Sequence, residues 1–407
     1  MRANSVHASL AAALLLAAHP QTAAGGTFAD DTAFLKAHQE TIILSDATGS
    51  ARLAVVPALQ GRVMTSSSGG DAGQSYGWIN RELIASGRVL PHMNAIGGED
   101  RFWMGPEGGQ FSVFFEKGKA FEFSNWFTPA IFDTLPFELV SNSRGSAVFG
   151  ARFALTNYSG TTFEVSVKRT VRVLESEASW SELGVAPIPG VGLVAYETDN
   201  QITNAGGRAW TRDTGLLSVW ILGQYNPSPS TTIVVPIRAG PDTALGARVT
   251  ADYFGAIPAD RIAVTENTVF LSADGRLRSK IGISPRRSRA VLGSYDAVGR
   301  VLTIVRFNQP ADASDYVNSL WKLQDNPFGG DVENAYNDGP AAPGAKPMGP
   351  FYELESSSPA AALAPGGSLT HIRRTFHLSG PRQALDVVAR QVLSVSIDEI
   401  EGALVRR

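Results

Sequence analysis

Cysteine is absent from this chain of 407 residues, and that absence excludes several kinds of chemistry. Without cysteine there are no disulfide bonds, thiolate metal sites or cysteine nucleophiles, and no lipid-modified cysteine of the bacterial lipoprotein kind. Charged residues make up only 18% of the chain, and the net charge of −3 leaves no basic excess for the phosphates of a nucleic acid. No apolar run is long enough to span a membrane as a helix, so we expect no transmembrane segment.

Histidine is scarce, and familiar catalytic motifs are missing. There is no G-x-S-x-G elbow, no P-loop and no dinucleotide fingerprint after a strand. The separation of the histidines in the chain argues against a three-histidine metal site. The histidines outside the first 24 residues are His38, His92, His371 and His377. The sequence therefore does not favour a serine hydrolase, a nucleotide-binding enzyme or a histidine metalloenzyme.

The N-terminal segment has the pattern of a signal peptide. Arg2 gives a positive start, Leu10–Ala18 is a short apolar run, and the small residues 22–24 offer a cleavage site. An ordinary N-terminal helix is the alternative. We expect residues 1–24 to be removed on export to the periplasm or the medium. Residues 25–407 are then expected to form a single soluble β-sandwich domain. The bacterial periplasm is the expected compartment, because a large exported domain without disulfides fits it.

Strand patterns dominate the rest of the chain. Thr162–Val173 alternates polar and apolar side chains, as a half-buried antiparallel strand does. Many short runs punctuated by glycine and proline predict an all-β protein built as a large antiparallel sandwich. Helices are expected only at Thr27–Gln39 and Pro381–Ser394, and a long functional or flexible loop at Asn308–Pro350. Further strands are expected at Ile42–Leu44, Leu53–Val56, Val63–Ser67, Ala147–Phe153, Leu193–Tyr196, Leu216–Leu222, Thr231–Val235, Val249–Phe254, Val269–Leu271, Arg289–Tyr295, Val301–Phe307 and Leu369–Phe376.

The segment Asn94–Phe115 concentrates the residue types that a sugar-binding cleft needs. Charged side chains and aromatic rings lie between two Gly-Gly pairs, and a strand-like run follows at Gln110–Phe115. Carboxylates and arginine can bind hydroxyls, an indole face can stack on a pyranose ring, and glycine permits close backbone approach. A tight turn with a structural arginine–carboxylate pair is the alternative. The candidates in and near this segment are His92, Glu99 and Glu107 for catalysis, and Asn94, Asp100, Arg101, Trp103 and Trp126 for substrate binding.

A second polar segment, Asp331–Pro340, gathers short oxygen- and nitrogen-bearing side chains. These could bind sugar hydroxyls, or supply oxygen ligands for a hard cation such as calcium, although the spacing of an EF-hand is absent. The same residues are also typical of a turn. Asn334, Asn337 and Asp338 are the candidate substrate-binding residues here.

Glu353 and Glu355 lie in a strand-like segment that begins at Phe351. Alternate residues of a strand share a face, so these two carboxylates are expected side by side, about 7 Å apart. Mutual repulsion and burial would raise the pKa of one of them, which suits a catalytic acid/base pair. A solvated strand face that carries two glutamates is the alternative.

Four segments resemble an uncharacterised bacterial family of galactose mutarotase-like proteins. They are Gly61–Ser67, Tyr76–Ile84, the block around Gly97–Trp103, and Phe351–Leu378 with its Pro-Gly-Gly turn. The resemblance covers most of the chain after the N-terminal segment. It implies a β-supersandwich of two large antiparallel sheets with a sugar cleft on a concave face.

The resemblance also bears on catalysis. Aldose epimerases of this fold use a histidine as general acid and a C-terminal glutamate, in a Leu-Glu-Thr segment, as general base. Leu354-Glu355-Ser356 is similar to that segment. However, no histidine lies between His92 and His371, so the mid-chain catalytic histidine has no counterpart. The resemblance therefore implies a sugar site, and the missing histidine argues against a typical mutarotase.

Three functions remain open from the sequence. The first is an exported carbohydrate-active enzyme of epimerase, lyase or hydrolase type, with Glu355 or Glu353 as base and His92, Glu99 or Glu107 as acid. The second is a periplasmic saccharide-binding protein without catalysis, and the third is an envelope structural protein without a ligand. A carbohydrate is the expected partner and no cofactor is expected, with calcium as the alternative.

Overall fold

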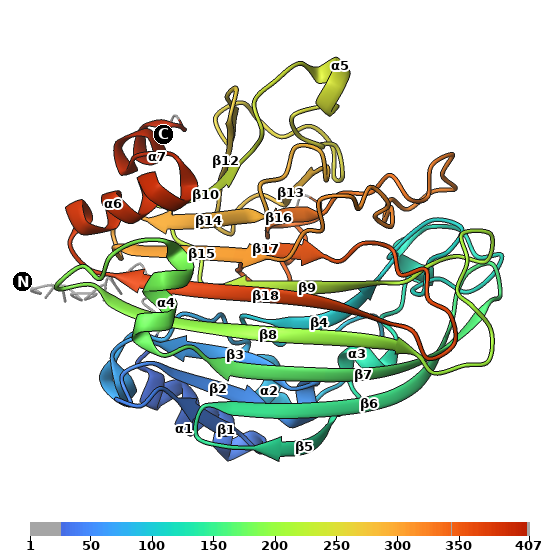
Figure 1. Ribbon diagram of the computed structural model, residues 1–407, viewed down its shortest axis with the longest axis horizontal. Helices are drawn as coiled ribbons and strands as arrows, with labels where there is room; N and C mark the ends of the chain where they lie inside the picture. The colour runs from blue at the N-terminus through green and yellow to red at the C-terminus, as the bar shows by residue number, and fades with distance from the viewer. Residues whose placement is uncertain (1–25, 343, 405–407) are drawn as a thin grey trace, which may run out of the picture.

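The computed structural model describes residues 26–342 and 344–404. The expected signal peptide, residues 1–24, lies outside the described residues. Ten antiparallel strands form the larger sheet, which faces the viewer in Figure 1. In spatial order they are β11 (Ile262–Val264), β12 (Thr268–Ser272), β10 (Thr231–Pro236), β14 (Val291–Asp296), β15 (Val301–Phe307), β18 (Ser368–Ser379), β8 (Gly192–Asn204), β7 (Thr162–Val173), β6 (Ser146–Thr156) and β5 (Glu138–Asn142).

Two smaller antiparallel sheets lie behind it and form the second layer (Figure 1). A backbone bridge between Val63 and Asp100 joins these two sheets edge to edge. The three-stranded sheet has the order β1 (Ile42–Ser45), β2 (Arg52–Val56) and β3 (Arg62–Ser67). The five-stranded sheet has the order β13 (Ser279–Ile283), β16 (Glu333–Asn337), β17 (Tyr352–Ser357), β9 (Ser218–Tyr225) and β4 (Arg101–Gly105).

The main core lies between the two layers, where apolar side chains from facing strands pack together. Leu354 of β17 and Val305 of β15 belong to one buried cluster, and Ile221 of β9 and Val165 of β7 belong to another. Burying such side chains is the main stabilising contribution to a sandwich. Polar contacts also cross the interior: His377 of β18 lies 3.1 Å from Oε2 of Glu99, the residue two places before β4.

Helices cover the ends and one outer face. Buried residues of α4, α6 and α7 pack in one cluster with Leu302 and Phe376 on the outside of the ten-stranded sheet. α1 lies beside α2 and the three-stranded sheet, and begins at a capping box made by Thr27 and Asp30. No helix in the described part of the chain has the length and apolar character needed to cross a membrane. The helices are α1 (Phe28–His38), α2 (Arg81–Ser86), α3 (Ala130–Asp133), α4 (Ser176–Leu183), α5 (Asp242–Leu245), α6 (Arg382–Leu393) and α7 (Ile397–Gly402).

The predicted fold class, a large antiparallel β-sandwich with helices near both ends, is confirmed. Three local predictions are wrong. Gln110–Phe115 is a turn rather than a strand, because the rings of Phe114 and Phe115 pack into an aromatic cluster instead of pairing along a sheet. Val249–Phe254 makes only isolated bridges. The long loop Asn308–Pro350 contains strand β16, whose polar residues concealed it.

Candidate functional site

The outer face of the five-stranded sheet is polar, and the pairing register shows why. Neighbouring strands align Lys280 of β13 with Tyr336 of β16, then with Glu353 of β17 and Gln224 of β9. Residues paired across a sheet share a face, so these polar side chains all point away from the core. A second row two residues away contains Asn334 and Glu355, followed by Leu222 and Arg101. The prediction that Glu353 and Glu355 share a strand face agrees with this register.

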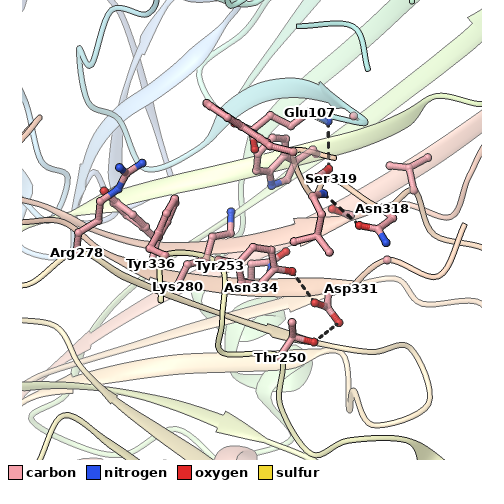
Figure 2. Close-up of a pocket in the computed structure, with 18 of the residues that line it drawn as sticks. Glu107, Thr250, Tyr253, Arg278, Lys280, Asn318, Ser319, Asp331, Asn334 and Tyr336 are labelled. Carbon is pink, nitrogen blue, oxygen red and sulfur yellow. Dashed lines mark hydrogen bonds between the residues drawn. The ribbon is translucent and has the colours of Figure 1, made fainter. Parts of the chain in front are cut away.

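A pocket of about 810 Å³ lies on this polar face. Lys280, Asn334 and Tyr336 rise from the sheet, and loops from three distant parts of the chain form the walls (Figure 2). A volume of this size is typical of small-molecule sites. The wall residues with polar or aromatic side chains are Glu107 after β4, Phe123, Thr250, Tyr253 and Phe254 before β13, and Asn318, Ser319, Trp321, Asp331 and Asp338 around β16.

Glu355 lies beneath the pocket floor and is held by two residues of the sheet that line the pocket. Lys280 Nζ donates to Oε2 of Glu355 at 3.0 Å, and Trp220 Nε1 donates to the same oxygen at 2.9 Å. Oε1 of Glu355 is buried and has no hydrogen-bond partner among the described residues. Burial alone would lower the pKa of Lys280, but the carboxylates of Glu355, Glu107 and Glu353 together outweigh burial and raise it. Lys280 is therefore a cation on the pocket floor at neutral pH.

Glu353 lies next to Glu355 on β17 and has different partners. Gln224 Nε2 donates to its Oε1 at 2.9 Å, and Arg101 Nη2 approaches the same oxygen at 3.8 Å. Burial, followed by the repulsion of Glu355, raises the pKa of Glu353 to about 7. Arg101 also covers the ring of Trp103, with 4.1 Å from its guanidinium carbon to the ring centroid.

Glu107 is the predicted catalytic residue that lines the pocket wall. It follows β4, and its backbone N–H donates to Oγ of Ser319 at 3.1 Å, which ties this wall to the loop before β16 (Figure 2). Burial raises the pKa of the Glu107 carboxyl, and Lys280 opposes this rise. The side chain therefore keeps its proton to a higher pH than an exposed glutamate would, as a general acid must.

The two aspartates of the wall already have hydrogen-bond donors. Tyr253 Oη donates to Oδ2 of Asp331 at 2.6 Å, and Tyr336 Oη donates to Oδ1 of Asp338 at 2.9 Å. Burial raises the pKa of both carboxyls. Asn334, which also faces the pocket, donates to Tyr253 Oη at 3.2 Å. These contacts fix two tyrosine rings upright around the cavity.

The Gly-Glu-Asp-Arg sequence at residues 98–101 splits between two faces. Arg101 lies on the pocket face of β4, whereas Glu99 and Asp100 lie in the interior between the layers. Ser66 N–H donates to Oε1 of Glu99 at 2.7 Å. Asp100 accepts from Arg169 at 2.6 Å and lies 3.4 Å from Nε of Arg373. None of the residues that line the pocket is Glu99 or Asp100.

Other predicted residues also lie outside the pocket wall. Asn94 binds the Asp133 carboxylate at 2.7 Å, and Asn337 donates to the backbone of Leu277 at 2.9 Å, so both hold loops in place. His92 lies 2.6 Å from the Trp126 carbonyl oxygen through Nδ1 and stacks on Phe127. Trp103 and Trp126 are buried side by side, with ring centroids 6.3 Å apart. The substrate and catalytic roles predicted for these residues remain predictions.

The segments around Arg101 and Glu355 lie on one sheet rather than on opposite walls of a cleft. The strand that contains Arg101 and Trp103 pairs with β9, and β9 pairs with the strand that contains Glu355. These residues therefore share one floor, because all three strands belong to the same sheet. The described residues contain no cluster of three or more His, Asp or Glu side chains placed to hold a metal ion.

Several pocket residues were missed from the sequence. Lys280 lies in strand β13, which the sequence did not reveal, and Arg278 immediately precedes that strand. Tyr253 lies in a segment that was expected to be a strand. A detectable signal was the alternation of Arg278, Lys280 and Gly282 around Ile281 and Ile283, which is typical of a strand with one polar face.

Comparison with solved structures finds several proteins at low identity, some of which are described as mutarotase-like. The Slr1438 protein of Synechocystis is 14% identical, with a TM-score of 0.48, and the match covers 84% of this chain and 96% of that one. A galactose mutarotase-like protein of Lactobacillus casei is 9% identical, with a TM-score of 0.41 and coverage of 84% and 99%. A galactose mutarotase related enzyme of Lactobacillus acidophilus is 7% identical, with a TM-score of 0.44 and coverage of 84% and 97%. Similarities this distant give no correspondence between individual residues.

The comparisons by sequence give one family and no individual relative. No curated protein matches the chain. The model of a family of unknown function, DUF6786, matches residues 26–404, which is nearly the whole of the described chain. The expected membership of an uncharacterised family is thereby confirmed. The chain belongs to this DUF6786 family.

Proposed function

We propose that this protein binds a saccharide in the pocket on the five-stranded sheet and acts on it by acid/base chemistry, with Glu107 as proton donor and Glu355 as base. The observation that carries the proposal is the composition of one cavity of about 810 Å³. Aromatic and polar side chains line it, and the carboxylates of Glu355, Glu107 and Glu353 act on a single lysine at its floor.

The aromatic and polar groups suit a sugar ring. Trp220, Trp321 and Tyr253 supply flat apolar surfaces against which the C–H face of a pyranose can pack. Asn334 and Asn318 supply amide groups that can both donate to and accept from hydroxyls. Apolar faces combined with hydroxyl partners are what a sugar ring requires of its site.

The two glutamates have environments that separate their roles. Burial raises the pKa of Glu107, which favours its protonated form and a proton-donor role. Glu355 has an ammonium 3.0 Å from its Oε2, which stabilises a negative charge there. A pair of carboxyl groups in contrasting environments is the usual basis of acid/base assignment. In this proposal the unpartnered Oε1 of Glu355 accepts a proton from a sugar hydroxyl or carbon, while Glu107 protonates an oxygen of the same ring.

The test begins with a panel of saccharides and a melting-temperature readout. The saccharides that bind are then assayed for turnover with wild type, Glu107→Gln and Glu355→Gln. Both variants are expected to lose turnover by about 100-fold or more while still binding. Glu116→Gln, at an exposed residue outside the pocket, is the control and should keep full activity. If no saccharide binds, the proposal is wrong.

A non-catalytic saccharide-binding protein is the second candidate. It is favoured by the complete burial of Glu355, with 0% of its surface exposed and Oε2 already bound by two donors. In that case the wild type binds a saccharide but turns over none, and Glu355→Gln changes affinity rather than rate. We also propose that the protein is exported, on the strength of the N-terminal residue pattern alone.

A further inference from the structure

Arg278 lies on one side of the pocket and is placed to meet a ligand. It stands two residues before Lys280, so both side chains leave the chain on the same side of the sheet. Figure 2 shows its guanidinium group beyond Tyr336, at the edge of the cavity. Its guanidinium carbon lies 3.9 Å from the centroid of the Phe254 ring, which therefore covers one face of the group.

Arg278 has no ionic partner among the described residues: no carboxylate oxygen there lies within 4.0 Å of its nitrogens, and its buried Nε has no hydrogen-bond acceptor. The arginine at position 261 contrasts with it. Both terminal nitrogens of Arg261 bind the carboxylate of Asp274, at 3.0 and 2.5 Å. A guanidinium that is partly buried without such a partner has not recovered its desolvation cost within the protein.

The anions of the pocket wall do not supply that partner. Asp331 and Asp338 accept hydrogen bonds from tyrosine hydroxyls, and Glu355 is paired with Lys280. Lys346, which also lines the pocket, makes no ion pair with a described residue either. Arg278 therefore lies within electrostatic range of Asp338 and Glu107 without an ion pair to either, and its guanidinium makes no hydrogen bond with a described residue.

We propose that the saccharide is acidic and that Arg278 binds its carboxylate. This inference rests on the proposed function and names the substrate class for the same pocket. The planar guanidinium presents parallel N–H donors that match the two oxygens of a carboxylate, which a lysine cannot do. Phe254 limits the rotation of the Arg278 guanidinium and leaves the N–H edge of that guanidinium free. The sugar ring is therefore expected to lie over Lys280 and Tyr336, with its carboxylate toward Arg278.

The experiment compares sugars that differ only at one carbon. Binding of galacturonate and glucuronate, and of short oligomers of each, is measured by calorimetry beside galactose, glucose and the matching neutral oligomers. A sulfated galactose tests whether any anionic group suffices. The acidic sugars are expected to bind about 10- to 100-fold more tightly than their neutral counterparts, which is the usual value of a hydrogen-bonded ion pair.

Arg278→Gln is expected to remove that preference and leave the affinity for the neutral sugars unchanged. Arg278→Lys keeps the positive charge but lacks the parallel N–H donors, so it should recover only part of the preference for acidic sugars. Arg276→Gln is the matched control, because it removes the same charge from an exposed residue that lies two positions away and outside the pocket wall. Thermal melting of all three variants checks that each is folded.

The outcomes separate this inference from the proposed function. Equal binding of acidic and neutral sugars, or an acidic preference that survives Arg278→Gln, overturns the role of Arg278 while the saccharide site stands. Tighter binding of the sulfated sugar than of the uronates overturns the carboxylate assignment. If no sugar of either kind binds, both the inference and the proposed function are wrong.

Discussion

The ammonium nitrogen of Lys280 lies 3.0 Å from Oε2 of Glu355, and the two residues belong to strands that are separated by β16 alone. The lysine side chain is 12% exposed and the glutamate is fully buried, so the pair spans the boundary between the pocket and the sheet beneath it. A ligand that contacts Lys280 would therefore also change the charge environment of Glu355.

Replacing Lys280 with methionine should destabilise the protein strongly, because Glu355 would remain buried without its counter-ion. We expect a loss of about 3 kcal/mol in the free energy of unfolding, measured with urea. The double variant Lys280→Met with Glu355→Gln should recover much of this loss. Arg144→Met, which breaks an exposed pair with Glu175, is the control and should cost less than about 1 kcal/mol. Equal effects at the two sites would contradict the structural role of the pair.

Glu353 should make stability depend on pH in a defined direction. Its folded-state pKa of about 7 is above the ordinary value of 4.5, so both states are protonated at low pH and the unfolded state ionises first as the pH rises. Stability is therefore lost between these two values. Glu353→Gln removes the effect, and its stability relative to wild type should rise by about 3 kcal/mol from about pH 4 to about pH 8. Glu138→Gln, at an exposed residue of β5, should show no such trend.

Asp100 should act on stability rather than on ligand affinity. Its carboxylate lies in the interior, 2.6 Å from Arg169 and 3.4 Å from Arg373. Asp100→Asn leaves two buried cations without a counter-ion and should lower the free energy of unfolding by about 3–5 kcal/mol. The exposed Asp71→Asn is the comparison and should have little effect. If Asp100→Asn kept full stability but lost saccharide binding, the sequence prediction of a substrate-binding role would be supported instead.

Trp103 and Trp321 should respond differently to truncation. Trp103 is 2% exposed and packs among Phe114, Trp126 and Trp220, so Trp103→Ala should cost about 3–5 kcal/mol of stability. Trp321 is partly exposed in the pocket wall, and Trp321→Ala should mainly weaken saccharide binding. Calorimetric binding and urea unfolding of both variants test this contrast. Loss of affinity only in the Trp103 variant, with stability retained, would reverse the assignment.

The predicted export has a direct test. Expression of the full chain in a Gram-negative host, followed by fractionation and N-terminal sequencing, should give a periplasmic product that begins at or near residue 25. Arg2→Glu with an additional charge in Leu10–Ala18 should retain the chain in the cytoplasm. A cytoplasmic wild-type product with an intact N-terminus would favour the alternative of an ordinary helix.

The sequence indicates strands with alternating or continuous apolar side chains much better than strands with a polar outer face. Strands with apolar side chains toward a core, such as Thr162–Val173 and Val301–Phe307, have the predicted bounds. Strands β4, β13 and β16 were missed, because their outer faces carry charged or amide side chains that resemble a loop in a single sequence. The strands that carry the pocket floor are therefore the ones that local patterns describe least well.

Prediction of the candidate site from the sequence has a similar limit. The sequence places Glu107, Asn334 and Asp338 among the candidates, and all three line the pocket. It could not separate Arg101 from Asp100, because a one-residue step along an extended chain changes the face on which a side chain lies. Glu99 precedes β4, and its carboxylate turns inward to Ser66 and His377. Lys280 and Arg278 were missed since each is a lone cation until the register of β13 brings it to the pocket.

Strand β18, the last strand in the described part of the chain, lies in the middle of the ten-stranded sheet between β15 and β8 (Figure 1). It pairs with β8 over twelve residues, Ser368–Ser379 against Gly192–Thr203. Until this strand arrives, β15 and β8 present two open edges at the centre of the molecule, where a foreign strand could add. Folding of this protein must therefore wait for nearly the whole chain, and the incomplete chain is the form that most needs protection from aggregation.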